Sequence, residues 1–159
     1  MIFEKNKVSK NAGFSLIEMM VTVAILGFSL SGLLGIFVYC SMLSNTAGNM
    51  SKVLRGAQGK LEEIRDHNYS LITTDYASGG NPGNKFNVAQ LNNGKGVIYI
   101  DSTNPDLLMV TVTVSWKNEN GRLFGEDKNL NGVLDAGEDL NGNNELDSPV
   151  SLISLIAKP

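Results

Sequence analysis

The sequence predicts an α+β protein in which a long N-terminal helix packs on a small antiparallel β-sheet. The first half of the helix is an almost continuous apolar run over residues 14–43. Helical spacing continues beyond this run, and no proline interrupts it before Pro82. From residue 97 onward apolar and polar residues alternate instead, which is typical of strands.

Composition excludes several classes of protein. The 159 residues suit one small domain plus a further element, because a domain commonly takes about 100–150 residues. The net charge of −3 and the pI near 5.1 argue against a nucleic-acid partner. A single cysteine excludes an intramolecular disulfide, and a single histidine argues against a histidine-rich zinc site.

The apolar run is long enough to cross a membrane, since about 20 apolar residues span a bilayer as a helix. Glu18 is its only charged residue. Three lysines precede the run and an acidic body follows it, which predicts a cytoplasmic N-terminus and an external body over residues 44–159. We therefore expect a single-pass protein of the inner (cytoplasmic) membrane, with a periplasmic or extracellular C-terminal domain.

Two ordinary explanations compete for this run. A secretory signal peptide has an apolar region of only about 7–15 residues, followed by a small-residue cleavage site. The run here is longer, and no clear A-x-A site follows it. A plain signal anchor fits the length, but Glu18 argues against it, because a carboxylate in an apolar helix costs about 3 kcal/mol on insertion and is functional by default.

The helix is expected to extend from about residue 15 to about residue 67. Its outer half carries an apolar stripe at intervals of three or four residues, formed by Met50, Leu54, Ala57, Leu61 and Ile64. Because charged residues occupy the other faces, this stripe should pack against the remainder of the domain. His67 falls where the helix should fray, and we interpret it as a surface residue without a role.

The sheet is expected to contain three to five antiparallel strands. The predicted strands are residues 86–89, 97–100, 107–116, 122–124 and 150–156. In the clearest strand the expected core face is Val110, Val112, Val114 and Trp116, with Thr111, Thr113 and Ser115 on the opposite face. Asn120-Gly121 predicts the turn of a hairpin.

The junction between leader and apolar run reads Lys10-Asn11-Ala12-Gly13-Phe14-Ser15-Leu16-Ile17-Glu18. It resembles the N-terminal signal of type IV prepilins and pseudopilins, in which a short basic leader ends in Gly and Phe-x-Leu-x-Glu follows. Gly13, Phe14, Leu16, Ile17 and Glu18 stand at the motif positions. The resemblance covers about the first 30 residues directly, and the helix-then-sheet plan is also that of a pilin.

The resemblance implies a processing and assembly route. A membrane-embedded prepilin peptidase and methyltransferase would remove residues 1–13 after Gly13 and methylate the new terminal residue, Phe14. The mature chain would keep its apolar run as membrane anchor and filament-core helix, and would assemble with other pilins or pseudopilins. In the filament, Glu18 would pair with the terminal ammonium group of a neighbour, and breaking such a buried pair costs about 3–5 kcal/mol.

Two departures from the family pattern point to a minor component. Major pilins of this type usually carry a proline where Gly35 stands here. They also tend to close a C-terminal loop with a disulfide, whereas Cys40 is the only cysteine and lies within the apolar run. The resemblance is therefore closest to PilV-like minor pilins, with pseudopilins as the alternative.

Residues 126–147 form an acidic insert between two predicted strands. They hold seven carboxylates and one lysine, a net charge of −6, so the remainder of the chain carries +3. A twelve-residue pattern begins at Asp127 and recurs at Asp139. The first copy matches the calcium-loop pattern D-x-[DN]-x-[DN]-G-x5-E at every specified position.

Calcium takes six to eight oxygen ligands at about 2.3–2.6 Å, so its ligands alternate along a tightly turned loop. The expected ligands of the first copy are the side chains of Asp127, Asn129, Asn131, Asp135 and Glu138 and the carbonyl group of Val133. Gly132 permits the sharp bend. The few formal charges predict weak affinity of the extracellular class, roughly 10⁻⁴–10⁻³ M.

The second copy is incomplete. Its candidate ligands are Asp139, Asn141, Asn143, Glu145 and Asp147. Asn144 replaces the glycine, and Val150 stands where a glutamate would close the loop. The sequence therefore predicts one calcium ion, and it leaves open whether the second copy binds another or is an acidic turn that binds nothing.

No enzyme motif is present: the sequence lacks G-x-S-x-G, a P-loop, H-E-x-x-H and a dinucleotide fingerprint. We expect a non-enzymatic minor pilin of a type IV pilus with a calcium-stabilised loop. The alternatives are a pseudopilin of a type II secretion system and a membrane-anchored calcium-binding surface protein that never polymerises. A plain anchor should tolerate replacement of Glu18, whereas a filament subunit should not.

Overall fold

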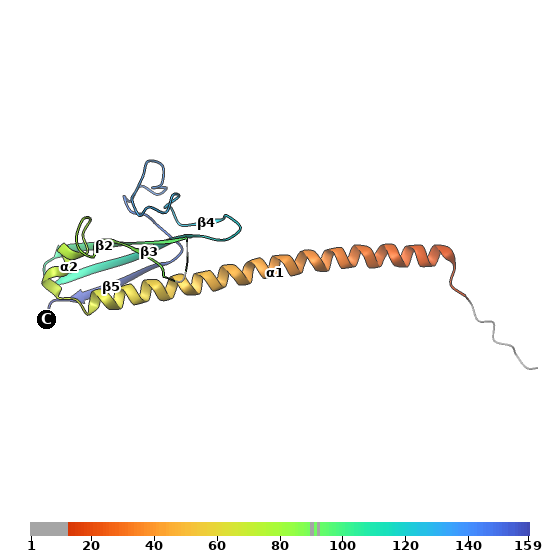
Figure 1. Cartoon of the computed structure of the whole chain (residues 1–159), viewed down its shortest axis with the longest axis horizontal. Coiled ribbons are helices and arrows are strands. Elements are labelled where there is room, and N and C mark those ends of the chain that lie inside the picture. The colour runs from red at the N-terminus through yellow and green to blue at the C-terminus, as the bar shows by residue number, and fades with distance from the viewer. Residues whose placement is uncertain (1–12, 90, 92) are drawn as a thin grey trace, which may run out of the picture. The chain divides into compact units, whose positions relative to one another are not determined.

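The computed structural model describes residues 13–89, 91 and 93–159, so residues 1–12 of the predicted leader lie outside the described residues. The chain divides into two compact units, Met1–Leu43 and Ser44–Pro159. Helix α1 (Leu16–Arg65) contributes residues to both units, and all strands belong to the second (Figure 1). The predicted α+β class is confirmed. Both ends of α1 lie within two residues of the expected positions.

The second unit contains one five-stranded antiparallel sheet. Its strands are β1 (Lys85–Asn87), β2 (Gly94–Asn104), β3 (Leu107–Lys117), β4 (Leu123–Phe124) and β5 (Ser151–Ala157). Strands β1 to β4 pair in chain order, and β5 pairs with the half of β3 that β4 leaves free. The predicted hairpin is confirmed, since the turn between β3 and β4 contains Gly121 at a φ of 83°.

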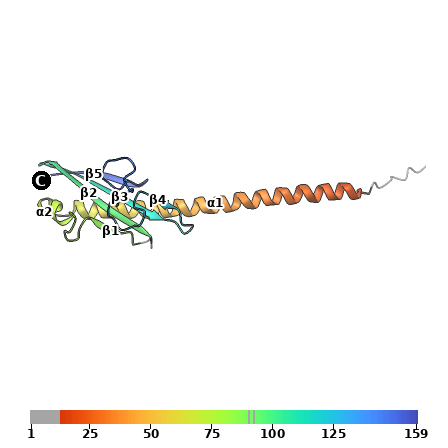
Figure 2. The ribbon, with the colours of Figure 1, turned by 90° about the horizontal axis from the view of Figure 1, so that it is seen from above.

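One face of the sheet packs on the outer half of α1, and the predicted core face of β3 is buried there. Figure 2 shows β2 and β3 lying across this part of the helix. The stripe that α1 buries consists of Val53, Ala57, Leu61 and Ile64. The prediction was wrong for Met50 and Leu54, which are 44% and 38% exposed. Leu54 lies at the edge of the buried stripe, and Met50 lies before its first residue.

The opposite face of β3 is also covered at one end, at Thr113 and Ser115. Their exposed fractions are only 3% and 2%. The connection from β4 to β5 lies on the side of the sheet away from α1 (Figure 1), and Gly125 at its start adjoins the Ser115 side chain. Val97 and Leu146 are buried outside the main core cluster. The acidic insert is therefore seated on the sheet.

A short helix, α2 (Tyr69–Asp75), follows α1 and was not predicted. Asn68 caps it by accepting a hydrogen bond from the backbone N–H of Ser70 at 3.1 Å. His67 lies 2.8 Å from Asp75, measured from Nε2 to Oδ2, and its ring meets Tyr76 edge-on. The interpretation of His67 as a residue without a role was wrong, because it links the end of α1 to α2.

Candidate functional site

The predicted processing point lies immediately before α1. Gly13 and Phe14 precede the helix, and the Phe14 side chain is 80% exposed. Ser15 caps the helix: its Oγ accepts the backbone N–H of Glu18 at 3.2 Å, and its carbonyl accepts that of Met19. Serine with glutamate three residues later is the spacing of a capping box, so Glu18 also suits the helix start structurally.

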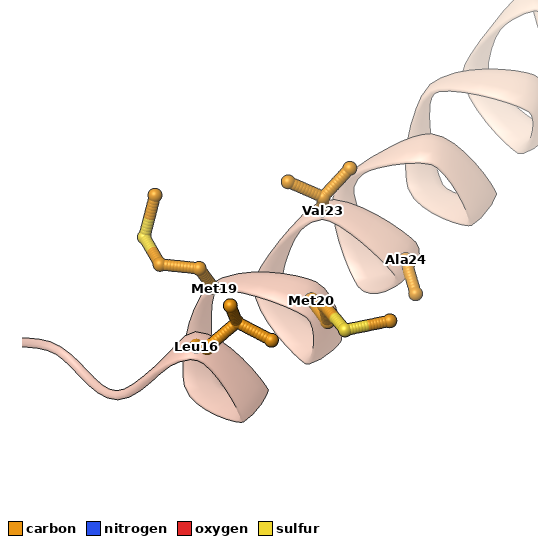
Figure 3. Close-up of a pocket in the computed structure, with 5 residues that line it drawn as sticks. All are labelled: Leu16, Met19, Met20, Val23 and Ala24. Carbon is orange, nitrogen blue, oxygen red and sulfur yellow. The ribbon is translucent and has the colours of Figure 1, made fainter.

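The described part of the first unit presents an entirely exposed apolar surface. Figure 3 shows Leu16, Met19, Met20, Val23 and Ala24 along the first turns, where they line an open apolar groove. Among the described residues, α1 is the one helix long and apolar enough to cross a membrane. Hydroxyl groups of Thr22, Ser29 and Ser31 donate hydrogen bonds to helix carbonyls one turn earlier, that of Thr22 to Glu18 at 2.7 Å. The surface therefore suits lipid or neighbouring helices.

The first loop, residues 127–138, folds around the side chain of Asp127. This carboxylate is buried and accepts the backbone N–H groups of Asn131 at 3.1 Å and Gly132 at 2.7 Å. Gly132 has a φ of 70°, a conformation that favours glycine. The bend predicted at the sixth loop position is therefore present.

The other predicted side chains of the first loop converge on Asp135. The Nδ2 groups of Asn129 and Asn131 donate to Asp135 Oδ2 at 2.7 and 2.8 Å. The bond from Asn129, and after it the bond from Asn131, is the main reason that the pKa of the Asp135 carboxyl group lies below its ordinary value. Glu138 is buried and spans the loop, accepting the N–H groups of Lys128 at 2.7 Å and Asp135 at 3.1 Å. Val133 lies on the outer bend and is 43% exposed.

The second loop, residues 139–150, repeats this arrangement over its first nine positions. Asp139 accepts the N–H groups of Asn143 at 3.2 Å and Asn144 at 3.0 Å, as Asp127 does in the first loop. The side chains of Asn141 and Asn143 both donate to Asp147. Asn144 has a φ of 62°, a conformation that asparagine tolerates better than most residues. Asn144 therefore makes the bend that glycine makes in the first loop.

The second loop is fixed to the sheet through Tyr99 of β2. The Tyr99 hydroxyl oxygen accepts the backbone N–H of Leu146 at 2.7 Å, and burial raises the pKa of this tyrosine. Glu145, at the seventh loop position, contributes its backbone N–H to Asn143 at 2.8 Å. Tyr99 therefore attaches the second loop to β2, and the bond of Glu145 stabilises the loop from within.

Glu126, directly before the first loop, was not among the predicted ligands. It is buried, and its carboxylate accepts the N–H groups of Leu140 at 3.1 Å and Asp147 at 3.0 Å, both in the second loop. The available sequence signal is a Gly-Glu-Asp triplet that occurs at residues 125–127 and again at 137–139.

Both loops bring asparagine amides and aspartate carboxylates together. Within the described parts of the chain, no three His, Cys, Asp or Glu side chains gather as they would around a metal ion. In each loop two asparagine side chains converge instead on one aspartate carboxylate, Asp135 in the first loop and Asp147 in the second. Such oxygen donors suit calcium, and they do not suit zinc or other metals that prefer nitrogen and sulfur ligands.

The comparison with known families identifies the N-terminal segment. The family model described as the prokaryotic N-terminal methylation motif matches residues 8–34. No curated protein and no solved structure matches the chain. The matched segment contains Gly13, Phe14 and Glu18, and it confirms the resemblance to type IV prepilins and pseudopilins. The motif supports a type IV pilin-like protein, and the apolar helix α1 fits membrane anchoring.

Proposed function

We propose that this chain is a non-enzymatic minor pilin of a type IV pilus, similar to the PilV-like proteins. The observation that carries the proposal is the methylation motif over residues 8–34, placed at the start of an exposed apolar helix. A sheet domain that carries its own hydrophobic core leaves this helix free to pack with other subunits. The protein works by assembly, with prepilin peptidase and other pilins as its partners.

The geometry supports a specific role for Glu18. Phe14 and Glu18 lie about one helical turn apart, and neither has a core around it. After cleavage the ammonium group on Phe14 and the carboxylate of Glu18 are opposite charges about one turn apart at the start of the helix. In an apolar filament core, each charge needs a partner on a neighbouring subunit, which fixes the register between subunits.

A pseudopilin of a type II secretion system is the second candidate, because the same motif serves both assemblies. We place the mature chain in the inner membrane as a single-pass protein, with residues 44–159 outside the cytoplasm. The lysines before the apolar run and the acidic body after it support this orientation. After assembly the chain is part of the fibre.

We further propose that calcium binds the first loop through Asp127, Asn129, Asn131, Asp135 and Glu138 and the Val133 carbonyl. The side chains of this set already converge within one loop. A half-turn of each asparagine amide exchanges its nitrogen for its oxygen, so the same side chains can face an ion. An ion there would neutralise the buried carboxylates and hold the insert on the sheet.

Cleavage after Gly13 predicts that Gly13→Val blocks processing. A branched side chain obstructs a narrow protease cleft that glycine enters freely, so the variant should keep residues 1–13 and remain in the membrane. The measurement is the mass of the chain extracted from a host with an active prepilin peptidase. Ala12→Val adds the same side chain one residue earlier and should still be processed. Normal cleavage of the Gly13→Val protein would contradict the proposed site.

The choice between pilus and secretion can be tested by deleting the gene in its own host. A minor pilin should be recovered in sheared surface fibres, and its loss should reduce the number of pili or their function while enzymes are still secreted. Retention of secreted enzymes in the periplasm of the deletion strain, with normal pili, would assign the chain to secretion instead.

A further inference from the structure

The second loop lacks a glutamate at its own twelfth position. Val150 stands there, and it is 4% exposed as part of the hydrophobic core. Its carbonyl accepts the backbone N–H of Val114 at 3.1 Å, so the chain at this point already follows the sheet. Val150 therefore cannot close the second loop.

Glu126 occupies the place that a closing glutamate would take. In the first loop, Glu138 accepts the N–H groups of the second and ninth positions, Lys128 and Asp135. In the second loop those positions are Leu140 and Asp147, and Glu126 accepts both of their N–H groups. The two glutamates therefore make the same pair of side-chain contacts, each with a different loop.

The backbone repeats the correspondence. The N–H of Glu138 donates to the carbonyl of Asp135 at 3.1 Å, and the N–H of Glu126 donates to the carbonyl of Asp147 at 2.8 Å. The residue before each glutamate is a glycine with a positive φ, 104° at Gly125 and 83° at Gly137. The same local conformation thus precedes each loop.

Charge supplies an observation that is independent of the loop geometry. Glu126, Asp127 and Glu138 are 9%, 1% and 3% exposed. Among the residues that the structure describes, ion pairs join only Lys60 to Glu63, Arg65 to Glu62 and His67 to Asp75. Each of the three buried carboxylates accepts two backbone N–H groups, but among the described residues none is paired with a cationic side chain. Hydrogen bonds leave their negative charge in place, and buried charges are normally paired or bound to a metal, which points to cations at the two loops.

We propose that Glu126 closes a second calcium site formed by Asp139, Asn141, Asn143 and Asp147 and the Glu145 carbonyl. The inference rests on the proposed calcium binding by the first loop. The two loops exchange glutamates: Glu138 closes the loop that it ends, and Glu126, which precedes the first loop, closes the second. The chain therefore holds two calcium ions as one unit, and the binding part of the acidic insert begins at Glu126 instead of Asp127.

The test is the calcium stoichiometry of the full processed chain in detergent, stripped with chelator and titrated with calcium by calorimetry. The wild type should bind two ions, and Glu126→Gln should bind one. Asp147→Asn should remove the same single ion. Glu119→Gln is the matched control, because it removes the same charge from an exposed position in the β3–β4 turn, outside both loops. It should still bind two.

The outcomes separate this inference from the calcium proposal on which it rests. Wild-type protein that binds no calcium would overturn both. Two ions in the wild type and still two, with unchanged affinity, in Glu126→Gln would overturn the role of Glu126 alone. The role of Glu126 would also be overturned if the wild type bound one ion and Glu138→Gln, but not Glu126→Gln, lost it. If Glu126→Gln does not fold in chelator, Glu126→Asp, which keeps the charge but withdraws it by one methylene, should show the same loss of one ion.

Discussion

Replacement of Glu18 by glutamine is expected to exclude the chain from filaments while leaving its amount in the membrane and the fold of residues 44–159 unchanged. The reason is charge, because glutamine cannot form an ion pair with the terminal ammonium group of a neighbouring subunit. Losing one partner of a buried pair costs about 3–5 kcal/mol, which reduces incorporation by a factor of at least about 100. The measurement is an immunoblot of sheared fibres against the membrane fraction.

The helix cap provides the control for this experiment. Ser15 Oγ accepts the N–H of Glu18, and the capping box accepts glutamine as well as glutamate at the later position. Glu18→Gln therefore keeps the cap and removes the charge, whereas Ser15→Ala removes the cap and keeps the charge. We expect Ser15→Ala to enter fibres. Wild-type incorporation of Glu18→Gln would make the chain a plain anchor at this position.

Calcium is expected to raise the melting temperature of residues 44–159, which form a compact unit with their own core. Without the ion, the net charge of −6 in the insert repels itself. An ion that binds only the folded state stabilises it by RT ln(1 + [L]/Kd), about 1.4 kcal/mol at tenfold saturation. For a domain of this size the shift is about 6 °C. The measurement is thermal unfolding in millimolar calcium and in chelator.

Variants assign the effect to the loops. Glu138→Gln should lose the part of the melting-temperature difference that the first ion contributes. The double variant Glu126→Gln/Glu138→Gln should melt at the same temperature in calcium and in chelator. Comparing each variant with itself cancels any damage to its calcium-free form. Glu119→Gln, at an exposed position outside both loops, should keep the full difference. Equal melting temperatures of the wild type in both buffers, with no heat of calcium binding, would show that the insert is only a solvated acidic loop.

The sequence was sufficient for the elements that repeat a local pattern. The alternation of Val110, Val112 and Val114 identified β3 and its core face, because side chains in a strand point alternately to opposite sides. The unbroken helical spacing identified α1 to within two residues at each end. The short helix α2 was missed, since seven residues are too few to show a period.

The features that the sequence did not reveal depend on the tertiary structure. The sequence placed Thr113 and Ser115 on the face opposite the core, but it did not show that they are buried there against Ser151 and Gly125. His67 pairs with Asp75, the last residue of the unpredicted helix α2. No local rule reveals such burial or pairing, because the partners come from elements whose placement is set by the whole fold.

In the candidate calcium loops, too, some residues can be identified from the local sequence pattern and others only from the fold. Loop positions counted along the chain identified the first set of ligands from Asp127 to Glu138, since these residues follow one another within a single turn of chain. The same count assigned the end of the second loop to Val150, whereas the structure brings Glu126 to that place. Only comparison of the repeated Gly-Glu-Asp triplets signals the exchange, and the fold is needed to show which loop each glutamate joins.

The most direct test of the account is mass spectrometry of surface fibres purified from the native host. The account predicts a peptide from this chain that begins at Phe14, carries one methyl group on its terminal nitrogen, and is found in the fibre fraction. Residues 1–13 should be absent from that fraction. Recovery of the chain only from the membrane, with residues 1–13 still attached, would contradict its identification as a processed filament subunit.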